Sequence, residues 1–150
     1  MIKKSKSRKR HKPVVRSGVS ACDLLFASPT QPIRGQFHRN YFLHVYSALD
    51  DVSTNEIPDA MSWNLLNDIC NLTETLVLQG FCEDGDGIVN KASVVLGRCG
   101  TDFIHNGKMS LTADDASALR AMIDDYESIV STIPHREFVL MHRSTIDRLG

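Results

Sequence analysis

Apolar residues recur along most of the chain at spacings of three and four, the period of an amphipathic helix. The longest such stripe predicts a helix over about 59–79, with Pro58 and Asp59 at its start and Gly80 at its end. Trp63 lies off this stripe, so we expect it to cover a neighbouring element. The apolar positions of the stripe are Met61, Leu65, Leu66, Ile69, Leu72 and Leu76.

A second regular stripe begins after Thr112, which together with Asp115 resembles a capping box at a helix start. This helix is expected to run to about residue 132, before Pro134 ends it. We expect the two helices to pack on each other and to form the centre of the core. The apolar positions of the second stripe are Ala116, Leu119, Met122, Ile123, Tyr126, Ile129 and Val130.

The N-terminal half of the body has one weaker helical pattern. Residues 37–49 carry apolar side chains at helical spacing, and the polar stretch 50–59 is expected to be a loop. Residues 17–36 are punctuated by proline and glycine. They predict an irregular linker, or a strap packed on the body.

Between the two regular helices, residues 87–98 predict a shorter helix that Gly97 and Gly100 terminate. The Asn-Gly pair at 106–107 is a turn signal, compatible with a small hairpin or with a plain loop. A last helix is expected over about 135–149.

These elements define the expected architecture. No segment alternates strictly between apolar and polar residues, so the sequence predicts an all-α fold, a small bundle of four to five amphipathic helices. With 150 residues, of which 42% are apolar, the chain suits one helical domain, expected over 37–150. A linker over 17–36 and a basic arm over 1–16 precede it.

The net charge of −1 hides two oppositely charged parts. Residues 1–16 hold eight of the 17 Lys and Arg residues and no acid, which leaves nine bases and 18 acids for 17–150. Such an arm buries too little to order itself, so we expect it to be disordered. Its charge makes contact with DNA or RNA, without base preference, one interpretation. A solubilising tail, or one that folds back on the acidic body, are the alternatives. Its basic residues are Lys3, Lys4, Lys6, Arg8, Lys9, Arg10, Lys12 and Arg16.

The helix after Thr112 is strongly acidic. Its apolar stripe is committed to the core, so we expect its carboxylates to point largely outward. Such a face is either ordinary solvated surface or the binding site of a partner protein with a basic surface. The five acidic residues, with only Arg120 among them, are Asp114, Asp115, Asp124, Asp125 and Glu127.

The sequence contains no motif for a cofactor or for an activated nucleophile. The segment CEDGDGIVNKAS at 82–93 looks like a calcium loop, but it fails the EF-hand pattern in every register. His135 and His142 share a face of the last predicted helix, where one of them can act as a general base, yet no nucleophile motif accompanies them. We therefore expect no cofactor, no metal site and no enzymatic activity.

The cysteines and the hydropathy pattern bear on the compartment. Cys22, Cys70, Cys82 and Cys99 form no CxxC pair and match no zinc-site spacing, so we expect reduced, buried thiols. No apolar run is long enough to span a membrane, and no apolar segment follows the basic start as in a secretory signal. A cytoplasmic protein without membrane contact is expected.

Three features of the sequence together resemble a known family. They are the Lys/Arg-rich opening that ends in HKP at 11–13, the segment MSWNLLNDICNLTETLVLQGF at 61–81, and LTADDASALRAMIDDYESIV at 111–130. On these features the chain is similar to small uncharacterised proteins encoded in prophages and mobile elements of beta-proteobacteria. The resemblance implies a bacterial cytoplasmic setting and a mobile-element role, and it carries no functional residue with it.

The sequence thus favours a non-enzymatic accessory protein of a phage or mobile element that binds a host or defence macromolecule. An inhibitor of a nucleic-acid-targeting defence complex is one form, in which the acidic face meets a basic surface of the partner. The alternative is a protein that binds DNA or RNA directly and without sequence preference, with the arm as its main contact.

Overall fold

The computed structural model describes residues 27–28 and 30–149. Within these residues there are five α-helices and no strand, which confirms the predicted all-α bundle. None of these helices is long and apolar enough to cross a membrane. The arm predicted over residues 1–16 lies outside the described residues. The helices are α2 (Gly35–Thr54), α3 (Ala60–Leu78), α4 (Ile88–Asn106), α5 (Ala113–Val130) and α6 (His135–Leu149).

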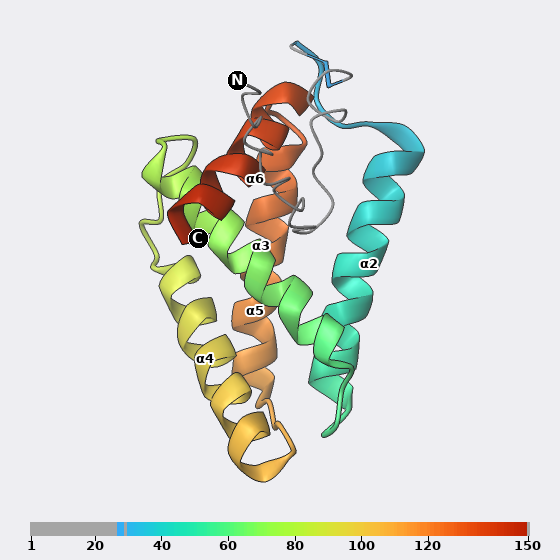
Figure 1. Ribbon diagram of the computed structural model, residues 1–150, viewed down its shortest axis with the longest axis vertical. Coiled ribbons are helices and arrows are strands. Elements are labelled where there is room, and N and C mark those ends of the chain that lie inside the picture. The colour runs from blue at the N-terminus through green and yellow to red at the C-terminus, as the bar shows by residue number, and fades with distance from the viewer. Residues whose placement is uncertain (1–26, 29, 150) are drawn as a thin grey trace, which may run out of the picture.

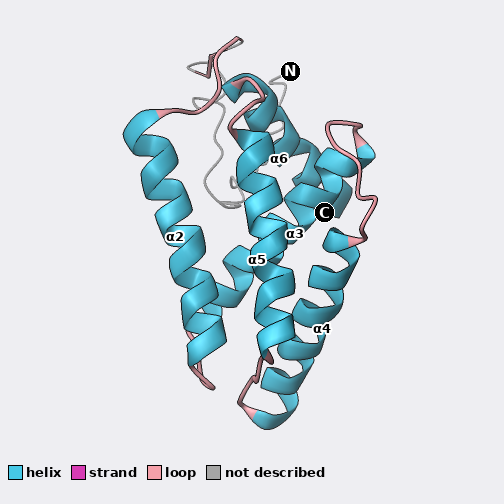
Figure 2. Cartoon of the chain, turned by 180° about the vertical axis from the view of Figure 1, so that it is seen from behind, coloured by secondary structure: helices cyan, strands magenta, loops and turns pink. Residues whose placement is uncertain are grey.

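The helices form two layers, one of α2, α5 and α4 and the other of α3 and α6. Helices α2, α5 and α4 lie side by side, with α5 in contact with both of the others (Figure 2). Helix α3 crosses the inner side of this layer diagonally and contacts all four other helices (Figure 1). Helix α6 packs on α3 and completes the second layer. The outer side of α5 is therefore left uncovered by the described helices (Figure 2).

The core lies where the two predicted stripes meet. Most positions of both stripes are buried, and α3 contacts α5 as predicted. Leu65, Ala116 and Ile129 are half-buried, and Met61, in the first turn of α3, is the one exposed position, at 69%. The fully buried large side chains of α3 and α5 are Leu66, Ile69, Leu76, Leu119, Met122, Ile123, Tyr126 and Val130.

Helix α2 continues to Thr54, so the predicted loop over 50–59 begins too early. Val52 continues the apolar spacing and is 1% exposed, which explains why the helix persists through its polar end. The Asp51 carboxylate accepts hydrogen bonds from the Ser62 hydroxyl at 2.6 Å and from the Asp59 N–H at 3.0 Å. This carboxylate therefore ties the end of α2 to the start of α3.

Helix α4 continues to Asn106, so the predicted termination at Gly97 and Gly100 is wrong, and so is the hairpin considered for 101–110. Both glycines keep a helical backbone, since glycine inside a helix costs only about 1 kcal/mol. The actual end is Gly107, whose φ of +71° is the left-handed conformation that glycine adopts most easily.

The prediction that Trp63 covers a neighbouring element is confirmed. Its ring lies against Gly100 of α4, and its Nε1–H donates to the Leu96 carbonyl at 3.0 Å. A Cβ at Gly100 would stand 2.8 Å from Cζ2 of this ring. The second glycine of α4 thus makes room for the tryptophan.

The described part of the linker packs as a strap across the start of α6. Ala27 and Ile33 are buried. The carbonyl of Ser28 accepts a hydrogen bond from the N–H of Arg136 at 2.9 Å, and that of Gln31 from His135 at 2.8 Å. The chain is therefore fixed to the bundle just before α2 begins.

The two glycines of α4 should respond oppositely to alanine. Gly97→Ala should raise the free energy of unfolding by about 0.5–1 kcal/mol, because nothing lies within 4 Å of the new Cβ and alanine favours the helix. Gly100→Ala should lower it by about 1–3 kcal/mol, because the new methyl collides with a ring held in place by its hydrogen bond. Urea unfolding of both variants measures the difference, and equal effects would contradict this packing.

Candidate functional site

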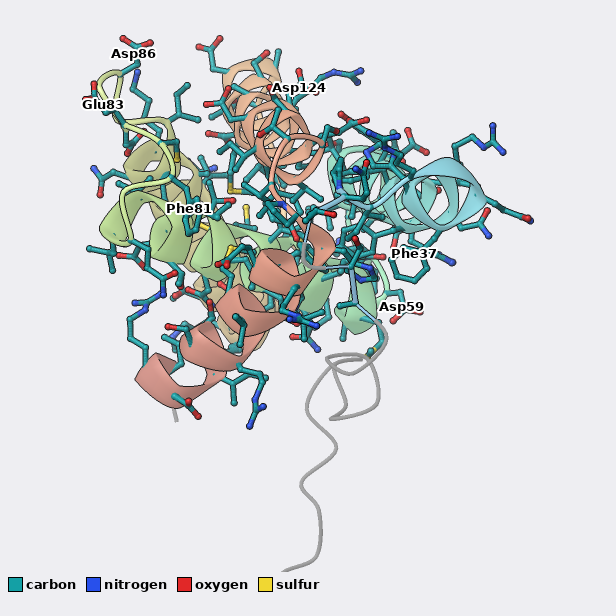
Figure 3. The ribbon with its side chains drawn as sticks, turned by 90° about the horizontal axis from the view of Figure 1, so that it is seen from above. Phe37, Asp59, Phe81, Glu83, Asp86 and Asp124 are labelled. Atoms are coloured by element: carbon teal, nitrogen blue, oxygen red, sulfur yellow. The ribbon has the colours of Figure 1, made fainter. Side chains whose placement is uncertain are left out.

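Six carboxylates gather along the outer side of α5 and the adjoining loop between α3 and α4. We call them the acidic patch. None of them forms an ion pair with a described residue. Figure 3 shows three of them, Glu83, Asp86 and Asp124, on the same side of the bundle. The six residues are Glu83, Asp84 and Asp86 from the loop and Asp124, Asp125 and Glu127 from α5.

Asp125 shows how the two segments act on each other. Its pKa is raised first by burial, and then by the negative charges of Asp124, Asp84 and Asp86. Carboxylates from the loop and from α5 are therefore close enough to repel one another. A positive charge placed between them would relieve this repulsion.

Tyr46 of α2 joins the patch from the other side of α5. Its hydroxyl lies 2.8 Å from Oδ1 of Asp124 and 2.6 Å from Oε2 of Glu127. One hydroxyl proton can be donated to only one carboxylate at a time, so the second one is left facing an oxygen. Burial and the hydrogen bond to Glu127 together raise the pKa of the Tyr46 phenol. Arg120 stacks on the Tyr46 ring, 5.4 Å from its centroid.

A hollow of about 190 Å³ opens within the patch. Its apolar walls include Val77, Val89 and Ile129, and its polar lining includes Asp84 and Asp125. Oδ1 of Asp84 also accepts a hydrogen bond from the Ile88 N–H at 2.8 Å, so it caps α4. The remaining residues of the lining are Thr73, Cys82, Glu83 and Ser128.

The five acidic residues predicted on α5 fall into different environments. Asp124, Asp125 and Glu127 come together in the patch, whereas Asp114 is exposed in the first turn of the helix. For Asp115 the prediction of an outward-pointing side chain is wrong. Its carboxylate turns back to accept the Thr112 N–H at 2.9 Å, which completes the capping box.

Asp115 also pairs with Arg98 of α4 and is only 9% exposed. The Thr112 N–H and then the Arg98 guanidinium lower the pKa of this carboxyl. Its role is therefore to join α4 to α5, and the residue is not part of a partner-binding surface.

Sequence reasoning missed four members of the site. In the sequence, Glu83, Asp84 and Asp86 belong to the segment that fails the EF-hand pattern, and nothing there singles out Tyr46. No local signal marks them, because they become neighbours of α5 only through the tertiary packing. The arm residues proposed to contact nucleic acid, Lys3 to Arg16, lie outside the described residues.

The thiols do not form a reactive centre in the described part of the chain. Cys70 and Cys99 are buried, and burial raises the pKa of both thiols, that of Cys70 to about 11. The pKa of Cys82 is raised as well, chiefly by burial. Among the described residues, no group of three or more His, Cys, Asp or Glu side chains could hold a metal ion.

The two histidines of α6 differ in their surroundings. His135 lies near Phe37 and Phe138, with ring centroids 5.9 and 6.3 Å apart. The ring of His142 packs edge-on against Phe138 at 4.5 Å, and its buried Nε2 has no hydrogen-bond partner. Burial lowers the pKa of His142 to about 4. This imidazole therefore stays neutral at pH 7 within a packed region.

The acidic patch is thus a hollowed, negatively charged surface built from α2, α5 and the loop before α4. Its composition suits a ligand that brings positive charge together with some apolar surface. No family model, curated protein or solved structure matches the chain.

The buried imidazole of His142 should make the bundle sensitive to acid. Its pKa is lower in the folded state than in the unfolded chain, so the unfolded chain binds the proton first as the pH falls. The free energy of unfolding should therefore decrease between about pH 6.5 and pH 4, by on the order of 3 kcal/mol. His142→Gln should flatten this part of the curve relative to the wild type.

The matched control for this measurement is His105→Gln, which replaces an exposed histidine of α4. Denaturant unfolding at intervals of half a pH unit gives the curves. A wild-type slope that survives in His142→Gln would show that other groups cause it.

Proposed function

We propose that this protein is a non-enzymatic accessory protein of a phage or mobile element, and that it binds the basic surface of a partner protein through the acidic patch. An inhibitor of a nucleic-acid-targeting defence complex is its concrete form, with carboxylates standing where phosphates would bind. The observation that carries the proposal is the pair Asp124 and Glu127, which share one hydroxyl and have no cationic partner among the described residues.

An arginine or lysine of a partner would supply what this pair lacks. Hydrogen bonds between a cationic donor and a carboxylate are about twice as strong as neutral ones. A guanidinium has five N–H donors and can bridge two carboxylates that one phenol cannot satisfy. Tyr46 holds Asp124 and Glu127 near each other, so little ordering is left for the binding step.

The charge of the whole body favours the same kind of partner. Of the 18 acidic residues all but Asp23 lie in the described part of the chain, together with nine basic ones, so that part carries a net charge of −8. A field of one sign speeds the encounter with an oppositely charged surface, and salt screens it. The resemblance to prophage-encoded proteins supports the biological setting of the proposal.

Neutralising the α5 part of the patch should weaken partner binding through the association rate. In the variant Asp124→Asn, Asp125→Asn, Glu127→Gln we expect the association rate at low salt to fall about tenfold and its salt dependence to flatten. The partner is obtained by affinity capture from a bacterial host lysate, with and without nuclease treatment. Surface plasmon resonance at several salt concentrations then gives the rates.

The control variant removes the same three charges at the opposite end of the bundle, as Asp50→Asn, Glu56→Gln, Asp102→Asn. It should retain most of the wild-type rate, because the change in net charge is the same but the patch is intact. Coincident rates for wild type and patch variant would make the patch ordinary solvated surface.

The second candidate function is direct binding of DNA or RNA by the arm, favoured by its eight bases and no acid. With at most eight phosphate contacts, the slope of log affinity against log salt should be no steeper than about −7. A chain that begins at Gly18 should lose this binding. Titration of a fluorescent oligonucleotide measures the salt slope of the full chain and the affinity of the shortened chain. Undiminished binding by the shortened chain would exclude the arm as the contact.

A further inference from the structure

An apolar pocket lies between the start of α3 and the end of α4, and we call it the α3–α4 pocket. It encloses about 140 Å³. Among the described residues that line it, none carries a charged side chain. The lining includes Trp63, Phe103 and Met109, together with the polar residue Asn64.

Contacts within the bundle hold this pocket open. The Nε1–H of Trp63 donates to the Leu96 carbonyl at 3.0 Å, so the ring is fixed against Gly100 and cannot turn into the pocket. The N–H of Met109 donates to the Glu56 carbonyl at 2.8 Å, which fixes the segment after α4 against the segment before α3. A ligand therefore meets walls that need little further ordering, and this favours binding.

The volume of the pocket corresponds to one six-membered ring. An apolar cavity of about 150 Å³ is large enough to bind benzene. The α3–α4 pocket has nearly this volume, and its residues are apolar except for Asn64 and the indole N–H of Trp63, which is already hydrogen-bonded. A single ring would therefore fill it and displace water that has few polar partners there.

The lining favours an aromatic ring without charge. Contacts with Trp63 and Phe103 stabilise an aromatic ring beyond the burial of its area, and the sulfur of Met109 adds a favourable contact with a ring. A charged group in this lining would have no ionic partner to compensate its desolvation. Asn64 is exposed, so its amide lies at the opening and can form a hydrogen bond with a polar substituent.

The surroundings of the pocket suit a small molecule better than a protein surface. A stable protein interface buries about 800 Å² on each partner. The exposed large apolar side chains in the lining or next to it in the chain are Ile57, Met61 and Ile104, which fall short of that area. Asp59 and Asp102 also adjoin lining residues, and in a two-fold dimer they would meet the same acids of the other copy.

We propose that the α3–α4 pocket binds a neutral aromatic molecule of one ring. The ring lies against Trp63, Phe103 and Met109, and a polar substituent is bonded by Asn64. This site goes beyond the proposed partner interaction, because the pocket and the hollow in the acidic patch share no residue.

The pocket is also separate from the acidic patch in space. Asp59 directly precedes Ala60, the first residue of α3 and a residue of the pocket lining. In Figure 3, Asp59 lies well apart from Glu83, Asp86 and Asp124. Occupation of the pocket therefore leaves the patch free.

Trp63 makes binding directly observable, because it is the only tryptophan of the chain. Iodobenzene is a suitable probe, since iodine quenches the fluorescence of an indole that it touches. Titration of the full chain should give a saturable loss of fluorescence, with a dissociation constant of about 0.1–1 mM. Quenching that rises linearly without saturation, as random collisions produce, would overturn the proposal.

A variant that fills the pocket tests where the ring binds. Ala60 lines the pocket and is exposed in the first turn of α3, so Ala60→Leu should occupy the space without disturbing the core. Iodobenzene affinity should fall by about tenfold or more. The matched control is Ala113→Leu, the same change at the exposed first residue of α5, which should keep the wild-type affinity. Equal affinities in the two variants would contradict binding in the pocket.

Competition with four further probes tests the chemical class of the ligand. Benzyl alcohol should displace iodobenzene at about tenfold lower concentration than benzoate or benzylammonium, which are charged. It should also act at lower concentration than cyclohexylmethanol, which has no aromatic ring. Equal displacement by all four compounds would reveal an unselective surface and refute the proposal.

Sedimentation velocity distinguishes a small molecule from a second copy of the chain. The wild-type protein should sediment as a monomer at the concentrations of the titration. A dimer that Ala60→Leu dissociates would assign the pocket to a second copy and overturn the proposal. None of these outcomes bears on the acidic patch, because the association rate with a partner is measured separately.

Discussion

The central position of α3 is the constraint on which the rest of the bundle depends. This helix contacts all four others, so even some of its polar side chains are buried and need internal partners. The Thr73 hydroxyl donates to the Ile69 carbonyl at 2.7 Å, and Thr75 accepts from the hydroxyl of Thr145 of α6 at 2.6 Å. These bonds give the buried hydroxyls of α3 their hydrogen-bond partners, and the bond to Thr145 helps to fix the position of α6 on α3.

The same constraint places the acidic patch on the outside. Helix α5 gives its apolar stripe to α3 and its flanks to α2 and α4, so its carboxylates remain on the one side left uncovered. At the end of α3 the chain reverses at Gly80, whose φ is +80°, and the Phe81 N–H donates back to the Leu76 carbonyl at 2.9 Å. This reversal is what brings Glu83 and Asp84 alongside α5.

The sequence predicted the parts of the fold that local physics determines. The stripes of α3 and α5 and the cap at Thr112 were predictable, because spacing and capping act within one helix. The length of α4 was not, since a glycine that ends a helix and one that accommodates Trp63 look alike in sequence. The capping box already implied that Asp115 turns back to the Thr112 N–H, so its outward-pointing prediction conflicted with a local signal; only its contact with Arg98 crosses between helices. The meeting of Tyr46 with Asp124 depends on the packing of α2 against α5, and no local pattern encodes that packing.

A charge layout of this kind has a consequence for stability. Repulsion of Asp125 by Asp84 and Asp86 favours the unfolded chain, in which the loop and α5 lie apart. Neutral residues at these positions would relieve the repulsion and give a more stable bundle, so the carboxylates do not serve the stability of the fold. The near-zero net charge of the whole chain does not remove this local repulsion, because screening in water limits each charge to a range of about 8–10 Å. Only a cation held within that distance can do so, and mobile solvent ions are not held in place. This local repulsion is therefore the physical reason for proposing that the patch binds an arginine or lysine of a partner.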